Sequence, residues 1–201
     1  MSINIYSKSE DYYVCKNIKH FCDFAGMDIK ESPEYKEGTN KYIYLCKKGD
    51  RTIKIIYIPI GSRYSKPADL NQLLSADSEF VIIKNSHIKK IKTTSLSVKV
   101  KVLDSKYFLV NQAKRFMVCG YKMRIVPKEE VNHIMKLYKI YNIKCFSAIS
   151  INAHEVIWLD AKLDDIIYLE YPTTASCEVT SNYKIVSTEV PLIEDEEEET
   201  D

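Results

Sequence analysis

Four segments between Glu129 and Val186 decide the fold: Glu-Glu-Val-Asn-His-Ile-Met-Lys-Leu-Tyr (129–138), Glu-Val-Ile-Trp-Leu-Asp (155–160), Asp-Asp-Ile-Ile-Tyr-Leu-Glu-Tyr-Pro-Thr-Thr-Ala-Ser (164–176) and Tyr-Lys-Ile-Val (183–186). They predict, in order, a helix, a second short helix, a buried strand that runs into a polar loop, and a last strand. We interpret the stretch as a small α/β docking module, and no residue pattern in it indicates an active site.

The first of these helices is predicted from the spacing of its apolar residues. Val131, Ile134, Met135 and Tyr138 lie at positions i, i+3, i+4 and i+7, which form one helical face. Pro127 suits the first turn, because its missing N–H would have no partner there. The apolar face needs cover, and the segments that follow are the nearest candidates.

The strand is predicted over residues 165–171. Alternate side chains of a strand point to opposite faces of the sheet. One face is expected to carry Ile167, Leu169 and Tyr171, and the other Ile166, Tyr168 and Glu170. Pro172 ends the strand, because proline cannot donate to a sheet ladder. Trp158, the only tryptophan, is expected to anchor the core rather than to stack on a ligand.

The order of motifs in this region matches a known family. The motifs are Pro-Lys-Glu-Glu-Val (127–131), Ala148-Ile149 before a polar segment, Val-Ile-Trp-Leu (156–159), Asp-Asp-Ile-Ile (164–167), the loop from Glu170 to Ser176, and Tyr-Lys-Ile-Val (183–186). This order resembles the C-terminal assembly domain of the fifth subunit of eukaryotic RNA polymerases and of its archaeal counterpart. The resemblance covers the last third of the chain well and the first two thirds loosely.

The chain departs from that family at several positions. The family usually carries Asp-Pro where this chain has Asn152-Ala153, and glycines near Asp160 and at Asp164. Its loop usually reads Arg, any residue, Ser, Glu, Thr, where this chain has residues 171–175. The departures bear on contacts of the loop and leave the order of elements intact. They resemble the versions carried by large DNA viruses, whose loop often includes a proline at the position of Pro172.

The resemblance implies a non-catalytic subunit of a multisubunit DNA-directed RNA polymerase. It implies a C-terminal assembly domain over residues 121–190 that docks on the largest subunit, with the other polymerase subunits as further partners. It also implies an N-terminal jaw domain over residues 1–120, with a mixed sheet like that of restriction endonucleases, beside downstream double-stranded DNA. A cellular subunit would be nuclear, and a viral one would be found in host cytoplasm and virion. The side chains expected at the subunit interface are Trp158, Tyr171, Thr173, Thr174, Ser176 and Tyr183.

The first 110 residues predict an α/β layer with one sheet. A capping box at Ser7–Glu10 opens a helix that Gly26 stops. Polar residues 28–40 predict a loop, and two β-rich runs around Lys47-Lys-Gly-Asp50 predict a hairpin. The helix carries an apolar stripe of Val14, Ile18, Phe21, Cys22 and Ala25. The other expected elements are a helix over 67–76 and strands over 79–84, 97–103 and 106–110.

Charge is unevenly distributed along the chain. The formal net charge is +1, but residues 194–201 hold seven of the 28 acids, which leaves 21 acidic against 29 basic side chains before them. A basic body with an acidic tail is typical of proteins that work beside nucleic acid, although a solubilising tail on an ordinary surface fits equally. The tail, residues 191–201, is expected to be disordered.

Lysines concentrate between residues 84 and 101. They can neutralise phosphates without reading base sequence, and the alternative is a solvated lysine face. The lysines expected beside DNA are Lys84, Lys89, Lys90 and Lys92, with Lys99 and Lys101 near them.

Two other functions are considered. A magnesium-dependent nuclease would use Asp69, Asp104 and Lys106, because that chemistry needs two acids and a lysine around the metal. The same Asp/Glu-x-Lys spacing also occurs at Asp28, Glu34 and Asp160, so chance explains it as well. A free-standing DNA-binding module is the third hypothesis. Sequence motifs for phosphate loops, serine nucleophiles or zinc proteases are absent, and no cofactor, metal or small-molecule ligand is expected.

The cysteines indicate free thiols. There are six, none in a C-x-x-C pair, and the four histidines do not cluster with them, which argues against a zinc site. We expect a reducing intracellular compartment. No apolar run approaches the ~20 residues that span a bilayer, so no membrane partner is expected.

Overall fold

The computed structural model of the chain describes residues 9–75, 77–88, 91, 93–172 and 179–188. The chain divides into two compact units, unit 1 (Met1–Ala113) and unit 2 (Lys114–Asp201), seven residues before the expected boundary near Gly120. Over the described residues the fold is α+β, with five α-helices and two mixed sheets of five and four strands. None of the helices described is long and apolar enough to cross a membrane.

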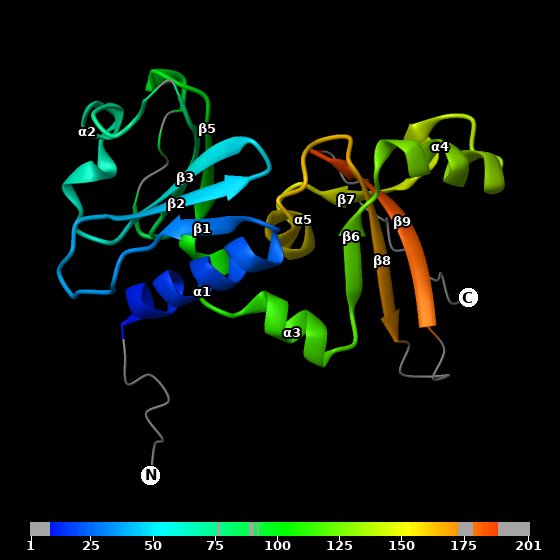
Figure 1. Cartoon of the computed structure of the whole chain (residues 1–201), viewed down its shortest axis with the longest axis horizontal. Helices are drawn as coiled ribbons and strands as arrows, with labels where there is room; N and C mark the ends of the chain where they lie inside the picture. Colours follow the sequence, from blue (N-terminus) through cyan, green and yellow to red (C-terminus); the bar gives the residue numbers. More distant parts are fainter. Residues whose placement is uncertain (1–8, 76, 89–90, 92, 173–178, 189–201) are drawn as a thin grey trace, which may run out of the picture. The chain divides into compact units, whose positions relative to one another are not determined.

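Unit 1 is built on a sheet of order β1-β2-β3-β4-β5 (Figure 1). The pairs β1/β2 and β2/β3 are antiparallel, whereas β3/β4 and β4/β5 are parallel. The predicted hairpin is confirmed, with Gly49 in the left-handed conformation (φ +61°) that its tight turn requires. The strands are β1 (Asp28–Glu31), β2 (Tyr42–Lys48), β3 (Arg51–Ile58), β4 (Glu79–Lys84) and β5 (Val100–Asp104).

Helices cover both faces of this sheet. On one face lies α1 (Glu10–Phe24), whose predicted apolar stripe is buried and whose Cys22 Sγ lies 3.6 Å from Cys46 Sγ of β2. On the other face, Leu70 of α2 (Pro67–Asn71) packs in a cluster with Ile56, Ile82 and their neighbours. Because both faces are covered, β3 and β4 carry nearly uninterrupted apolar runs, as parallel strand pairs require.

Several predictions for unit 1 are wrong in detail. Residues 106–110 do not form a strand, because the Asp104 carboxylate accepts a hydrogen bond from the Lys106 N–H (3.0 Å) and turns the chain into a 3₁₀-helix, η3 (Ser105–Phe108). Residues 28–31, predicted as loop, form the edge strand β1. The residue before α1 is Ser9, whose hydroxyl contacts Tyr35 and does not cap the helix; Ser7 lies outside the described residues. The helix expected over 67–76 ends at Asn71, and the strand expected from residue 97 begins at Val100.

Unit 2 is built on a sheet of order β6-β8-β9-β7. The pairs β6/β8 and β8/β9 are antiparallel, and β7/β9 is parallel. The predicted strand at residues 165–171 is confirmed, with Pro172 as its last residue, and the predicted final strand begins earlier than expected. The strands are β6 (Lys122–Ile125), β7 (Ser147–Ser150), β8 (Ile166–Pro172) and β9 (Val179–Ser187).

Both predicted helices of unit 2 are confirmed. On α4 (Lys128–Leu137), Val131, Ile134 and Met135 pack in one cluster with Ile166 and Ile185 of the sheet. The second helix, α5 (His154–Leu159), buries four consecutive residues, including Trp158. A further helix, α3 (Gln112–Val118), spans the division between the units in sequence.

Candidate functional site

A polar cluster lies where β4 and β5 end. The parallel register places Lys84 opposite Asp104, so the last residues of the two strands are neighbours. The Lys84 ammonium donates to Asp104 Oδ2 (3.2 Å) and to the carbonyl of Ile88 (3.1 Å). Asp104 Oδ1 accepts from the Ser86 hydroxyl (2.5 Å) as well as from the Lys106 N–H. The carboxylate therefore ties two strands and two turns together.

These contacts set the charge state of Asp104. Burial by itself would raise its pKa, but the hydrogen bonds from Ser86 and Lys106 and the charge of Lys84 outweigh burial and lower the pKa. A carboxylate with these contacts serves as a hydrogen-bond acceptor that stabilises the fold. The Lys106 ammonium lies instead over the ring of Tyr107 (5.1 Å), and Asp69 lies in the first turn of α2. No group of three His, Cys, Asp or Glu suited to a metal ion occurs among the residues described.

The lysines expected beside DNA are placed only in part. Lys84 is described, and its side chain is 13% exposed with its ammonium committed to Asp104. Because Lys84 is paired with Asp104 and little exposed, the expectation that it contacts a DNA phosphate is corrected. Lys89, Lys90 and Lys92 lie outside the described residues.

Of the predicted interface residues, Trp158 is fully buried in α5. It therefore belongs to the core, as the core interpretation predicts, and this corrects its placement at an interface, since its ring offers no surface to a partner. Thr173, Thr174 and Ser176 lie outside the described residues. Tyr171 and Tyr183 are described and half-buried.

Tyr171 and Tyr183 point to opposite faces of the unit 2 sheet. Residues directly opposite in an antiparallel pair share a face, and Tyr183 lies opposite Tyr168, whereas Tyr171 lies opposite Thr180. Tyr183 is on the α4 face, where its ring meets those of Tyr168 (5.2 Å) and Tyr138 (6.1 Å). A single flat contact surface would not use both tyrosines.

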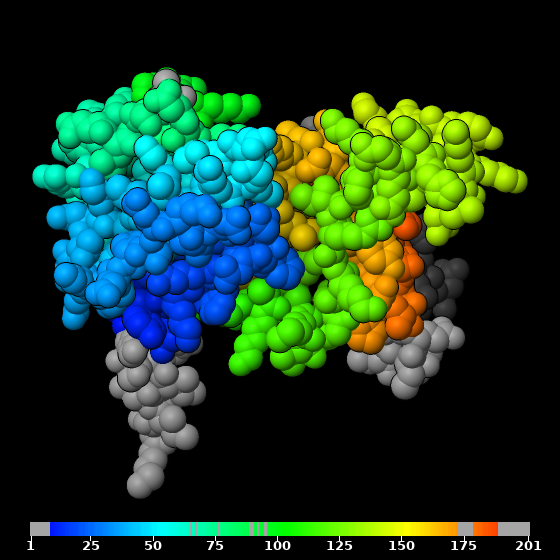
Figure 2. Space-filling model, viewed as in Figure 1, coloured from blue at the N-terminus to red at the C-terminus, as the bar shows by residue number. Residues whose placement is uncertain are grey.

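Tyr171 belongs to an apolar surface at one end of the β8–β9 hairpin. Its ring stacks on Tyr121 (5.7 Å, 26° between planes), and its hydroxyl accepts from the Asn182 amide (3.2 Å). Val179 is 62% exposed, but it pairs with Pro172 and therefore lies on the opposite face of the sheet from Tyr171. Figure 2 shows the green surface of β6 beside the orange surface of β8 and β9.

The end of α3 contributes to the same surface. Gly120 holds the chain against β8: its φ is +70°, and a Cβ there would lie 3.2 Å from Pro172 Cγ. Tyr121 follows directly, and the preceding Met117 and Val118 are exposed. We call Met117, Val118, Tyr121 and Tyr171 the hairpin-end patch.

Sequence reasoning missed most of the hairpin-end patch. Met117 and Val118 lie on a helix too short for a periodic signal, and Tyr121 precedes a strand of four residues. The stacking of Tyr121 on Tyr171 depends on the pairing of β6 with β8, which joins residues almost fifty positions apart.

Comparison with protein families and with curated proteins found no relative of the chain. No model of a protein family matches the chain, and no curated protein matches it with significance. A function for the chain therefore rests on its own residues, their geometry and the resemblance carried by residues 127–186.

Proposed function

We propose that the chain is a non-catalytic subunit of a multisubunit DNA-directed RNA polymerase, similar to the fifth subunit of eukaryotic polymerases and to its archaeal counterpart. In this proposal unit 2 docks on the largest subunit through the hairpin-end patch and residues 173–178. The observation that carries the proposal is the patch itself. Exposed clusters of large apolar side chains mark interaction surfaces in proteins, and this one borders the loop that the resemblance places at the interface.

Backbone geometry in unit 2 supports the resemblance independently. The family usually has glycines near Asp160 and at Asp164, and both aspartates here adopt left-handed conformations, with φ of 55° and 65°. That region of backbone space favours glycine, because other residues place Cβ too near the carbonyl. At these two positions the chain therefore has the backbone conformation that glycine favours, although the residues are aspartates.

The proposed role of unit 1 is to lie beside downstream double-stranded DNA. The support is the excess of basic side chains outside the acidic tail and the lysine-rich segment after β4. With Lys84 committed to Asp104, phosphate contacts would fall to the other lysines of that segment, such as the exposed Lys99. Such contacts are independent of base sequence and weaken steeply with salt.

The contacts of Asp104 and Lys106 argue against a magnesium-dependent nuclease. Its central acid, Asp104, already accepts hydrogen bonds on both oxygens, and its lysine lies over an aromatic ring. Metal-dependent cleavage of duplex DNA by the wild-type chain, abolished by Asp104→Asn, would reverse this conclusion.

The proposal is tested by affinity purification of the tagged chain from its native source. We expect the two largest polymerase subunits among the co-purifying proteins identified by mass spectrometry. Met117→Asp should lower their recovery at least tenfold, since it places a charge at a patch position that is 72% exposed. The matched control is Val110→Asp, at a valine of unit 1 that is 54% exposed, which should leave recovery unchanged.

Three results would count against the proposal in different ways. Recovery of the wild-type chain without polymerase subunits, from cells in active transcription, would remove the polymerase assignment. Equal recovery with Met117→Asp and Val110→Asp would keep the assignment but remove the patch as the docking surface. Tight duplex binding by the isolated chain, without partners, would favour a free-standing DNA-binding module.

A further inference from the structure

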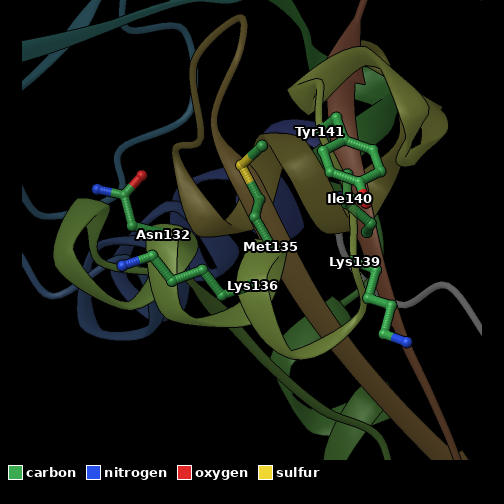
Figure 3. A pocket seen from close by; sticks show the side chains of 6 residues that line it. All are labelled: Asn132, Met135, Lys136, Lys139, Ile140 and Tyr141. Atoms are coloured by element: carbon green, nitrogen blue, oxygen red, sulfur yellow. The ribbon is translucent and has the colours of Figure 1, made fainter.

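A groove of about 570 Å³ runs along the C-terminal half of α4 (Figure 3). It is separate from the hairpin-end patch and plays no part in the proposed docking. Its lining residues are Asn132, Met135, Lys136, Lys139, Ile140 and Tyr141.

The groove exists because of the way α4 ends. Lys139 is left-handed (φ 54°), and the N–H groups of Lys139 and Ile140 donate back to the carbonyls of Lys136 (3.3 Å) and Met135 (2.8 Å). This is the Schellman arrangement, in which the second residue after the helix packs on the residue five positions before it. Ile140 is thereby placed next to Met135, and Tyr141 follows it at the edge of the groove.

The groove combines an apolar surface with two available cations. Tyr141 is 94% exposed, and Figure 3 shows Met135 between Lys136 on one side and Ile140 and Tyr141 on the other. Within the part of the chain that the structure describes, neither Lys136 nor Lys139 forms an ion pair or a side-chain hydrogen bond. Methionine adapts its shape to a range of apolar partners. The surface therefore fits an extended segment with apolar residues followed by acids.

The chain itself carries such a segment. Residues 189–201 read Glu-Val-Pro-Leu-Ile-Glu-Asp-Glu-Glu-Glu-Glu-Thr-Asp, with Val190, Leu192 and Ile193 directly before the acids. They follow β9, whose Ile185 packs in the same cluster as Met135 and Ile140. The six residues from 188 to 193 can span up to about 20 Å when extended. Such a short tether gives a local concentration on the order of millimolar.

We propose that residues 190–199 bind this groove within the same chain. Val190, Leu192 and Ile193 cover Met135, Ile140 and Tyr141, and the following carboxylates lie beside Lys136 and Lys139. The contact is partly electrostatic, so it weakens as ionic strength rises. A partner with a more acidic segment competes for the groove and releases the tail.

The first test is carbodiimide cross-linking of the dilute full-length chain at low salt. The carbodiimide activates a tail carboxylate, the lysine amine displaces the activated group, and an amide and a urea result. We expect Lys136 and Lys139 to link to Glu194–Glu199 in monomers far more often than the exposed Lys162 does, and the excess should vanish at high salt. Equal linking of all three lysines would overturn the proposal. Links confined to dimers would overturn it too, since the occupant would then be a second copy.

The second test uses methyl NMR of Met135. Deleting residues 189–201 should shift the Met135 methyl signal and leave that of Met123 on β6 unchanged, and a peptide of residues 188–201 should restore the shift. The variant Lys139→Gly removes a cation while keeping the left-handed turn, so it should weaken peptide binding several-fold without loss of fold. Fluorescence of the buried Trp158 reports that fold. A Met135 signal unmoved by the deletion would refute the proposal.

Discussion

The two units differ in which residues occupy their left-handed backbone positions. Every described left-handed residue of unit 1 is a glycine, at positions 26, 38, 49 and 61. In unit 2, Gly120 shares this conformation with Lys139, Asp160 and Asp164. A non-glycine residue there costs about 1–2 kcal/mol. Unit 2 therefore holds its turns by packing and hydrogen bonds that overcome local preference, whereas unit 1 has turns that its sequence favours.

The units differ also in where their charged pairs lie. In unit 1 the Lys84–Asp104 pair is mostly withdrawn from solvent at the ends of two parallel strands, although a second pair, Arg51–Glu79, is exposed. In unit 2 the pairs Lys122–Glu170 and Arg124–Glu130 each use a side chain of the edge strand β6 and are more exposed than Lys84–Asp104. Exposed pairs contribute little to stability, because water screens them and long side chains lose freedom. Electrostatic changes should therefore affect unit 1 more than unit 2.

The largest effect that separates the units should come from placing a charge in either core. Ile167→Asp in unit 2 and Ile82→Asp in unit 1 each replace a fully buried side chain, and each should cost about 3–5 kcal/mol. Trp158, the only tryptophan, reports on unit 2 alone. We expect its emission to shift to the red in Ile167→Asp and to stay unchanged in Ile82→Asp, while circular dichroism records a loss of structure in both. A red shift in Ile82→Asp would show that the two units unfold together.

A smaller effect should come from Asp104→Asn. At pH 7 it should lower the free energy of unfolding by about 1–3 kcal/mol, because the charged acceptor of Ser86 and Lys84 is lost. The folded pKa of Asp104 lies below its ordinary value of 3.8, so its contribution is complete above that value. As pH falls through the lowered pKa, the difference between wild type and variant should vanish. Urea unfolding at pH 7 and pH 3 measures both quantities. A difference that is the same at both pH values would contradict the role of the ion pair.

The smallest effect should come from giving unit 2 one of the glycines it lacks. Asp164 is exposed and left-handed, and its backbone N–H donates to the Val186 carbonyl (3.0 Å). Asp164→Gly should raise the free energy of unfolding by about 0.5–1 kcal/mol, because the backbone strain is relieved and that hydrogen bond is kept. The urea midpoint followed by Trp158 emission measures the change. Asp164→Ala is the control, and a gain of the same size there would mean that strain is not the cause.

The sequence predicts those elements whose patterns are local. The β2–β3 hairpin, β4 and α4 follow from a glycine turn, an apolar run and a helical stripe, and all three are confirmed. Failures occur where a distant contact decides. The edge strand β1 is mostly charged and exists because β2 offers it an unpaired edge. The turn at Lys106 exists because the Asp104 side chain caps it.

The candidate sites follow the same rule. Lys84 is one of several similar lysines in the sequence until the parallel register of β4 and β5 places Asp104 beside it. Tyr171 and Tyr183 suggest one interface until the register of β8 and β9 separates their faces. Trp158 is predicted correctly as a core residue, because its size and apolar neighbours are local facts. Register between strands is the information that spacing along one segment does not contain.

The strand order of unit 2 has a consequence for synthesis on the ribosome. The sheet of unit 1 is complete once β5 has emerged, whereas β9, an interior strand of unit 2, is the last of the described strands to be made. At about 5–20 residues per second, the 83 residues from Asp104 to Ser187 take about 4–17 s. Until the end of that interval, α4 and β8 emerge without the strand that pairs with both β8 and β7. The nascent chain therefore passes through a stage with a folded first half and an uncovered apolar second half, at which a chaperone or an assembly partner can bind.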